Sequence, residues 1–260
     1  MTNMDMDEVA PGDRDFVASL EKGLAVIEAF DASRPRLTLT EVAKLTGITR
    51  AGARRYLRTL TKLNYANFDG RYFSLNPRIL RLGYAYLAST SHSIRLQPFL
   101  ERISEQTGES SSAAMLDGDD IVYIARSATR RIMSIGLGVG SRLPAYCTSL
   151  GRAILAYQPQ QEIETYLERV KLEPRTPKTI TDKDQLRAAL VAVRDHGYSL
   201  VDEELEYGLI SIAVPLIQKD GTVTVALNIS AQAARASVAE MEERLLPALK
   251  DACEALRYTF

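Results

Sequence analysis

The first regular pattern of apolar residues lies between Phe16 and Phe30. Within it, apolar side chains recur at steps of three or four positions, at Val17, Leu20, Leu24, Ile27 and Phe30. This spacing predicts a helix with one apolar face. The loop that follows contains Pro35, which ends the helix.

Residues 40–63 have the pattern of two short helices joined by a tight turn. Their apolar positions also recur at helical spacing, and we expect burial at Val42, Ala43, Leu45, Ala53, Leu57 and Leu60. Gly47 lies between the helices, where the turn needs a positive φ that glycine adopts readily. Thr49 is a suitable N-cap for the second helix. With the helix over 16–30, this stretch predicts a helix-turn-helix module.

The face of the second helix opposite its apolar stripe is strongly basic. It carries Arg54, Arg55 and Arg58, with Arg50 on the flank of the first turn, and no Asp or Glu is interleaved to pair with them. Guanidinium groups neutralise phosphates and fork onto guanine edges, so this face favours a helix that reads the DNA major groove. An ordinary solvated basic face is the alternative.

A β-hairpin is expected directly after this helix. Asp69-Gly70 separates two short runs rich in aromatic residues, 65–68 and 71–75, which is a strong hairpin signal. A three-helix unit followed by a hairpin is a winged helix. Arg71, beside the turn, either contacts the phosphate backbone or keeps the wing soluble. The candidate DNA contacts are therefore Thr40, Thr49, Arg50, Ala51, Arg54, Arg55, Arg58 and Arg71.

Beyond Asn76-Pro77 the pattern changes. Residues 78–89 form a predicted helix that is apolar on more than one side, so it either dimerises or docks on its own chain. Extended apolar runs then predict strands over 111–116, 121–126, 132–137, 198–201, 210–217 and 222–230. Helices are expected over 98–108, 148–157, 159–170, 182–196 and 237–258, and a loop over 138–146. The fold class is α+β, with a sheet covered by helices.

We expect four parts along the chain, and the net charge differs between the N-terminal module and the rest. They are a disordered leader (1–15), a winged helix-turn-helix domain (16–76), a linker or dimerisation helix (77–92) and a sheet domain (93–260). Residues 16–82 carry twelve Lys or Arg against five Asp or Glu, a net +7, although the 260-residue chain has a net charge of −1. A basic module attached to an acidic body favours a nucleic-acid partner for the module alone.

The sequence also limits the compartment. The first fifteen residues have no apolar signal-peptide core, and no run of eighteen apolar residues exists, so we expect no membrane partner. Cys147 and Cys253 form no CxxC pair. Two distant cysteines fit a reducing cytoplasm without a disulfide framework.

No catalytic, cofactor or metal site is expected. The GLGVG run at 136–140 has the wrong spacing for a dinucleotide loop and lacks the Lys-Ser/Thr of a phosphate loop. The two histidines, His92 and His196, have no partners at metal-ligand spacing. No serine lies in a nucleophile-elbow context, and Cys147 is expected to be a small buried residue. We therefore predict a protein that is not an enzyme.

The sheet domain does carry candidate ligand-binding groups. Residues 202–206 are acidic and precede a strand, so they form either an exposed loop, which we prefer for Glu204, or the rim of a pocket. Nearby strand ends place Ser211, Asn228 and Ser230 at alternate inward positions. A few hydrogen-bonding groups in apolar surroundings are typical of a small-molecule pocket.

Several segments together resemble the IclR family of bacterial transcriptional regulators. They are SLEKGL, LTEVAKLTGITRAGARRYLRTL, DGRYFSLNPRILRLGYAYL, LPAYCTSLGRAILA and DEELEYGLISIAVP. LRLGYAYL together with RRIMSIGLGVGSRLPAYCTSLGR is most similar to the branch that controls aromatic-acid catabolism through protocatechuate and β-ketoadipate. The resemblance implies a winged helix-turn-helix domain, a dimerising linker helix and a GAF-like α/β effector-binding domain, assembled as a homodimer or a dimer of dimers.

The resemblance also implies an effector pocket. Matching segment by segment places it at Ile132, Ile135, Leu143, Ser149, Leu150, Asp202, Leu209, Ser211, Asn228 and Ser230. Effectors of this branch are small carboxylates, aromatic or dicarboxylic. We therefore expect the carboxylate to be bound by Arg130 or Arg131, or by the N–H groups that open the helix at Ser149.

The combined prediction is a cytoplasmic transcription factor whose affinity for operator DNA changes with a small carboxylate effector. An enzyme or ligand-binding protein acting on an aromatic acid, with the basic module as a tether, is the first alternative. The lack of a nucleophile, base or metal cluster argues against the enzyme. A structural DNA binder without sequence preference is the second alternative, and the polar positions of the sheet domain argue against it.

Overall fold

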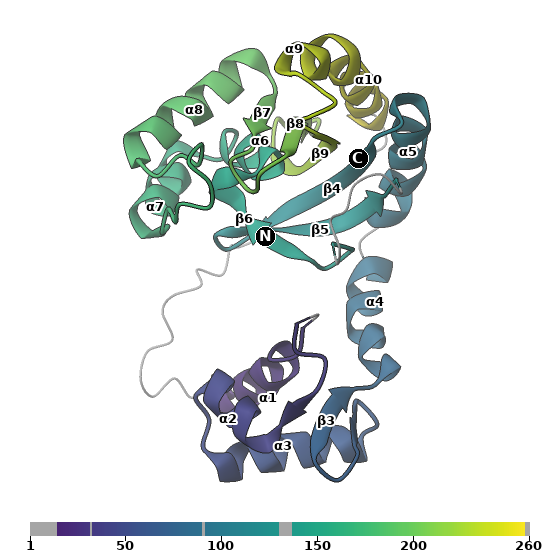
Figure 1. Cartoon of the computed structure of the whole chain (residues 1–260), viewed down its shortest axis with the longest axis vertical. Helices are drawn as coiled ribbons and strands as arrows, with labels where there is room; N and C mark the ends of the chain where they lie inside the picture. Colours follow the sequence, from purple (N-terminus) through teal and green to yellow (C-terminus); the bar gives the residue numbers. More distant parts are fainter. Residues whose placement is uncertain (1–14, 32, 90–91, 130–136, 258–260) are drawn as a thin grey trace. The chain divides into compact units, whose positions relative to one another are not determined.

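The computed structural model describes residues 15–31, 33–89, 92–129 and 137–257. The chain divides into two compact units, residues 1–85 and 86–260, which are treated separately below (Figure 1). Helix α4 (Leu80–Ser89) spans the boundary between them, after a 3-10 turn at Pro77–Ile79. None of the helices in the described ranges has both the length and the apolar character needed to cross a membrane.

The N-terminal unit is a winged helix-turn-helix, as predicted. Its elements are α1 (Ala18–Glu28), β1 (Leu37–Thr38), α2 (Leu39–Thr46), α3 (Arg50–Lys62), β2 (Ala66–Phe68) and β3 (Tyr72–Leu75). The turn before α3 has Gly47 at φ +67°, and Thr49 Oγ1 caps α3 by accepting a hydrogen bond from Gly52 N at 3.2 Å. Gly70, at φ +101°, closes the hairpin between β2 and β3.

The small core of this unit corrects the sequence prediction at its outer positions. The fully buried residues include Val42, Ala53 and Leu57, as expected, but Leu45 is 45% exposed. On α1, Leu20 and Leu24 are exposed while Val26 is buried, because only the C-terminal half of α1 packs in the core. The N-terminal part of the predicted stripe, Val17, Leu20 and Leu24, therefore lies on the surface, while Phe30 packs against the core. Leu37, expected in a loop, pairs with Phe73.

The C-terminal unit is an antiparallel sheet with helices on both faces, which confirms the α+β class. The strands are β4 (Ser110–Asp117), β5 (Asp120–Ser127), β6 (Arg142–Pro144), β7 (Ser199–Asp202), β8 (Leu209–Ile217) and β9 (Val223–Gln232), in the order β6-β5-β4-β9-β8-β7. The helices are α5 (His92–Thr107), α6 (Ser149–Leu155), α7 (Gln160–Arg169), α8 (Lys183–His196), α9 (Val238–Glu240), a π-helical segment (Met241–Leu245) and α10 (Leu246–Arg257).

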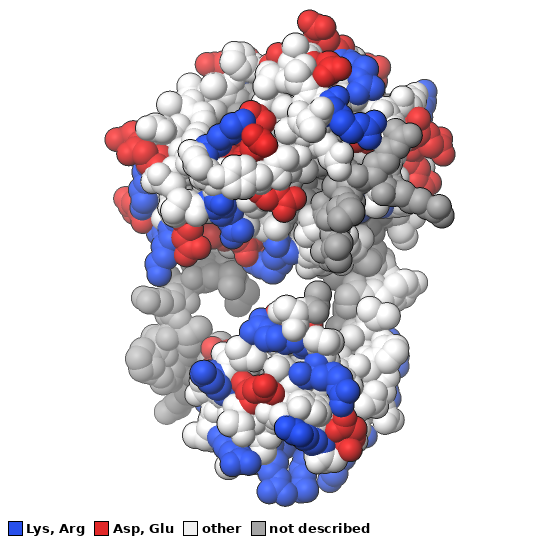
Figure 2. Space-filling view, viewed as in Figure 1, with Lys and Arg blue, Asp and Glu red and all other residues white. Residues whose placement is uncertain are grey.

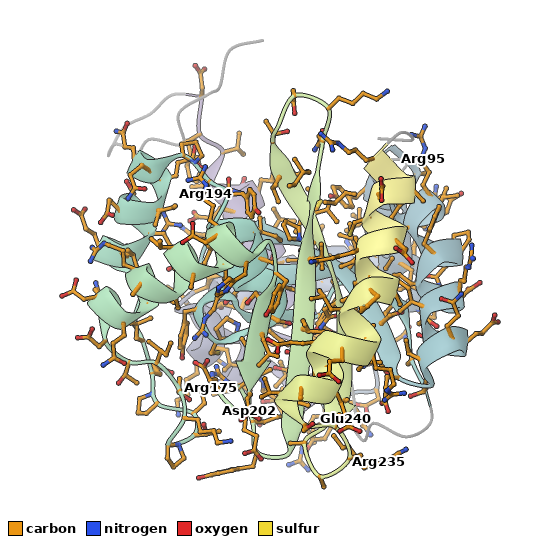
Figure 3. The ribbon with its side chains drawn as sticks, turned by 90° about the horizontal axis from the view of Figure 1, so that it is seen from above. Arg95, Arg175, Arg194, Asp202, Arg235 and Glu240 are labelled. Carbon is orange, nitrogen blue, oxygen red and sulfur yellow. The ribbon has the colours of Figure 1, made fainter. Side chains whose placement is uncertain are left out.

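Alternate strand residues pack under different helices. On β8, Ile210 and Ile212 belong to the core shared with α5 and α10, whereas Ala213 belongs to the core shared with α6, α7 and α8. Figure 3 shows the yellow α10 and the blue α5 together on one side of the strands, with the green helices on the other. Since Ser211 is also in phase with Ala213, it faces α6.

Three sequence predictions need correction or fall outside the description. Helix α5 begins at His92 and contains Pro98, whereas the sequence predicts that the helix starts at Pro98. The loop expected over 138–146 contains β6 and a 3-10 turn at Ala145–Cys147, because this stretch extends the sheet beside β5. The strand expected over 132–137 lies outside the described residues except for Leu137, which is not in a strand.

Candidate DNA interface and effector cavity

The basic face of α3 forms one wall of a groove in the N-terminal unit. The groove, of about 870 Å³, lies between α3, the start of α2 and the β2–β3 hairpin. The predicted DNA contacts that line it are Thr40, Arg50, Arg54, Arg55, Arg58 and Arg71. Thr49 and Ala51 are exposed at the start of α3 without lining the groove. Figure 2 shows blue side chains gathered over α3.

The arginines of α3 have no counter-charge among the residues that the structure describes. All of them are exposed. Within the described ranges, none of them forms an ion pair with a carboxylate. Their N–H donors remain available for phosphate oxygens and base edges, which is the electrostatic requirement of a nucleic-acid surface.

The wing is held in place by its own turn. Asp69 Oδ1 accepts hydrogen bonds from the N–H groups of Arg71 at 2.9 Å and Tyr72 at 2.7 Å, and these bonds lower the pKa of Asp69. Arg36 pairs with the same carboxylate. The guanidinium carbons of Arg36 and Arg71 lie 4.9 and 5.1 Å from the centroid of the Tyr72 ring. Two cations are thus fixed at the wing beside the groove.

The second candidate site is a cavity between α6 and the sheet. The predicted effector residues that line it are Ser149, Leu150, Leu209, Ser211, Asn228 and Ser230. The register explains the polar patch, because Ser230 on β9 lies directly opposite both Ser211 on β8 and Ser110 on β4. Directly opposite residues share a face of the sheet.

Two buried polar atoms in this cavity have no hydrogen-bond partner among the described residues. They are Ser149 Oγ and Asn228 Oδ1, on residues that are 1% and 3% exposed. Asn228 Nδ2 donates to Ser230 Oγ at 3.0 Å. Since buried polar groups are nearly always paired, these two atoms indicate a site for a hydrogen-bonding ligand. The free volume is about 20 Å³, room for about one water molecule, so a larger ligand has to displace lining side chains.

Of the other predicted effector residues, the described ones, Asp202 and Leu143, do not lie on the cavity wall. Asp202 is not on the lining because its carboxylate points to Lys178, with Oδ2 2.7 Å from Nζ; Figure 3 labels it at one end of the sheet. Leu143 packs in the core beneath α6. Arg130, Arg131, Ile132 and Ile135 lie outside the described residues. Helix α6 is short, and Thr148 Oγ1 already accepts from Gly151 N.

Glu204, expected in an exposed loop, is instead buried in an ion pair. Arg152 on α6 donates from Nη1 and Nη2 to the two carboxylate oxygens of Glu204 at 2.6 and 2.5 Å. Arg152 Nε also donates to Tyr146 O at 2.7 Å, and Ile180 N donates to Glu204 Oε2 at 3.1 Å. Leu205, the next residue after Glu204 in the chain, is one of the residues that line the cavity.

Sequence reasoning missed several lining residues. They are Tyr123, Cys147, Thr148, Val201 and Leu205. Strand alternation on β5 was the available signal for Tyr123, which faces α6 with Ile121. Burial raises the pKa of Tyr123, so its phenol stays neutral. The others depend on how loops fold over the sheet, which no local pattern encodes.

These features define a class of protein. A winged helix-turn-helix with an unpaired basic groove is a DNA-binding module, and the attached sheet domain encloses a cavity with unpaired buried polar atoms. Models of two families match the chain: the IclR helix-turn-helix domain over residues 19–70 and the bacterial transcriptional regulator IclR C-terminal domain over residues 84–258. The chain belongs to the IclR family of transcriptional regulators, and the family and its members are regulators rather than enzymes.

Individual relatives agree with this placement. The chain is 49% identical over 250 residues to a Pca regulon regulatory protein of Pseudomonas putida, covering 94% of this chain and 86% of the relative. The crystal structure of a transcriptional regulator from Rhodococcus sp. RHA1 superposes with a TM-score of 0.82 at 46% identity, covering 94% and 98% of the two chains. A double mutant of the PobR inducer-binding domain from Acinetobacter, in complex with 3-hydroxybenzoic acid, gives a TM-score of 0.60 at 34% identity, covering 64% of this chain and 97% of that domain.

Proposed function

We propose that this chain regulates genes of aromatic-acid catabolism in the cytoplasm, with α3 in the major groove of an operator and a small hydroxylated aromatic acid in the cavity beneath α6. One observation carries the proposal. The same chain combines a groove of unpaired arginines with a cavity that holds two unpaired buried polar atoms. The names of the relatives, a Pca regulon regulator and a domain holding 3-hydroxybenzoic acid, support the class of effector.

The DNA contacts follow from position on α3 and the wing. Arg50, Arg54 and Arg58 recur at helical spacing along the groove, so they are the candidates for base edges and adjacent phosphates. Arg71, fixed against Tyr72, is placed to contact the phosphate backbone from the wing. Thr49 and Ala51, exposed at the start of α3, are candidates for base contacts.

A homodimer, or a dimer of dimers, accounts for exposed apolar surface in the N-terminal unit. On α1, Leu20 and Leu24 are exposed, and on α4, Leu80 and Tyr84 are each 71% exposed. Apolar side chains grouped on helices in this way are typical of an association surface. A dimer would read a pseudo-palindrome with half-sites one helical turn, or a multiple, apart. We propose residues 16–76, 77–92 and 93–260 as the functional parts after a leader over 1–15.

Regulation is then a matter of linkage. If the effector binds one arrangement of the two domains more tightly, operator affinity changes by the same coupling free energy, typically about 1–3 kcal/mol. That corresponds to a change of about 5- to 150-fold in the dissociation constant of the operator complex.

The test measures binding of the purified full chain to its own upstream intergenic DNA at a fixed salt concentration, because phosphate contacts are strongly screened. Protocatechuate, 4-hydroxybenzoate and β-ketoadipate are added singly. Arg54→Ala should weaken specific binding by about 1–3 kcal/mol, whereas Lys22→Ala, an exposed cation on α1 outside the groove, should leave it unchanged.

Three outcomes separate the parts of the proposal. A severalfold shift by one acid supports the regulator and names its effector. If the chain binds the DNA specifically but none of the acids changes the affinity, the proposed class of effector is wrong. If the chain binds DNA without sequence preference, the proposal that it recognises an operator is wrong.

A further inference from the structure

The pairing between β4 and β5 contains an irregularity that redirects one side chain. Ala113 pairs with Ala125 and Ala114 pairs with Tyr123, so Ile124 is an extra residue on β5. Without such a bulge, Tyr123 and Arg126 would point to opposite faces, since they are three positions apart. The bulge restores them to the same face. The guanidinium carbon of Arg126 accordingly lies 5.6 Å from the centroid of the Tyr123 ring.

That face is the cavity face. Tyr123 lines the cavity. Arg126 lies directly opposite Ser112 on β4, and Ser112 lies directly opposite Asn228 on β9, which also lines the cavity. Ser111 Oγ donates to Leu100 O on α5, so Ser112, its neighbour in the strand, faces the other way. Adjacent strands are about 4.8 Å apart, so the backbones of Arg126 and Asn228 are about 10 Å apart, within reach of an extended arginine.

One donor of Arg126 is not used by any described residue, although its guanidinium also hydrogen-bonds to Tyr123. Its Nε is buried and has no hydrogen-bond partner among the described residues. No carboxylate in those ranges forms an ion pair with it. Arg152 on α6 differs because its donors are occupied by Glu204 and Tyr146. A partly buried guanidinium that has no counter-ion among the described residues, close to a cavity lined by neutral side chains, suits an incoming carboxylate.

We propose that Arg126 binds the carboxylate of the effector, with the effector ring in the cavity and a ring hydroxyl on Asn228 and Ser149. This assignment rests on the proposed function above. Arg126, Ser112 and Asn228 lie in a row across β5, β4 and β9, with Asn228 at the end away from Arg126. Asn228 Oδ1 only accepts hydrogen bonds, so it favours a ring hydroxyl, which donates, and disfavours a second carboxylate. The effector class is therefore a hydroxylated aromatic monocarboxylic acid. Arg126 takes the role that the sequence suggested for Arg130 or Arg131.

The test compares an acid with its neutral amide in the full chain. Calorimetry measures binding of 4-hydroxybenzoate, protocatechuate and 4-hydroxybenzamide to the wild type, Arg126→Met and Arg126→Lys. Arg194→Met is the matched control, because Arg194 lies over the Tyr157 ring at 5.8 Å, away from the cavity lining. Thermal unfolding followed by circular dichroism checks that each variant is folded, since Arg126 lies in the C-terminal unit and operator binding reports on the N-terminal one.

We expect the wild type and Arg194→Met to bind the better acid at least about 30-fold more tightly than the amide, as a charge-assisted hydrogen-bonded pair implies. Arg126→Met should bind acid and amide alike, and Arg126→Lys should fall between. Unchanged acid affinity in Arg126→Met overturns the assignment and leaves the proposed function intact. If the wild type binds the amide as tightly as the acid, the assignment of Arg126 is also overturned, whatever the variants show. A wild type that binds its operator but neither acid overturns the effector class as well.

Discussion

The buried ion pair between Arg152 and Glu204 gives the sharpest test of what holds the C-terminal unit together. The two side chains are 4% and 10% exposed. Glu204→Ala removes three hydrogen bonds at once, two from Arg152 and one from Ile180 N. It also leaves the Arg152 guanidinium buried without a counter-ion.

The expected cost follows from that orphaned charge. Removing one partner of a buried ion pair typically destabilises a protein by about 3–5 kcal/mol. A domain is stable by about 5–15 kcal/mol in total, so Glu204→Ala should consume a large share of the stability. The double variant Arg152→Met/Glu204→Leu should recover part of the loss, because it leaves no buried charge.

Urea unfolding followed by far-UV circular dichroism measures these differences. The matched control is Asp119→Ala, which removes a carboxylate that pairs with Arg169 at 2.6 Å in a half-exposed position. Exposed pairs contribute about 0–1 kcal/mol. If Glu204→Ala costs no more than Asp119→Ala, or if the double variant is less stable than either single variant, the reasoning about the buried pair is wrong.

Two further predictions concern α6 and the cysteines. A Cβ on Gly151 would lie 2.2 Å from Ala145 O, so Gly151→Ala should shift α6, lower the stability by about 1–3 kcal/mol and weaken effector binding. The control is Gly83→Ala, which has open space around it and should not lower the melting temperature. Equal melting temperatures for the Gly151→Ala and Gly83→Ala variants would contradict this prediction. Burial raises the pKa of Cys147 to about 11 and of Cys253 to about 12, against about 9 in the unfolded chain, so stability should fall as the pH rises above about 9. Both thiols should resist a disulfide reagent at pH 8 until urea unfolds the protein, and fast labelling of the native protein would contradict it.

The N-terminal unit could be predicted almost entirely, because its signals are short in range. The turn at Gly47, the cap at Thr49 and the Asp69-Gly70 hairpin each depend on residues within a few positions. The burial pattern of α1 was less predictable. Its apolar stripe is real, but which part of the stripe faces the core depends on where the neighbouring helices lie.

The acidic segment at 202–206 illustrates the opposite case. A run of carboxylates is usually solvated, and that is the correct expectation from composition alone. Glu204 is buried because Arg152 on α6, 52 residues earlier in the chain, forms an ion pair with it. Residues that pair at such a distance along the chain show no periodic pattern in a single sequence. The burial of Glu204 therefore required the fold.

Arg126 was missed for a more specific reason. The alternation rule that placed Ser211, Asn228 and Ser230 on one face assigns Tyr123 and Arg126 to opposite faces, and it fails at Ile124. A bulge adds one residue to one strand, so every assignment beyond it is inverted. The same irregularity that defeats the sequence pattern places the Arg126 guanidinium over the ring of Tyr123, which lines a cavity whose described lining residues are all neutral. The failure of strand periodicity at this point is thus itself a pointer to the site, in keeping with the concentration of bulges beside functional sites.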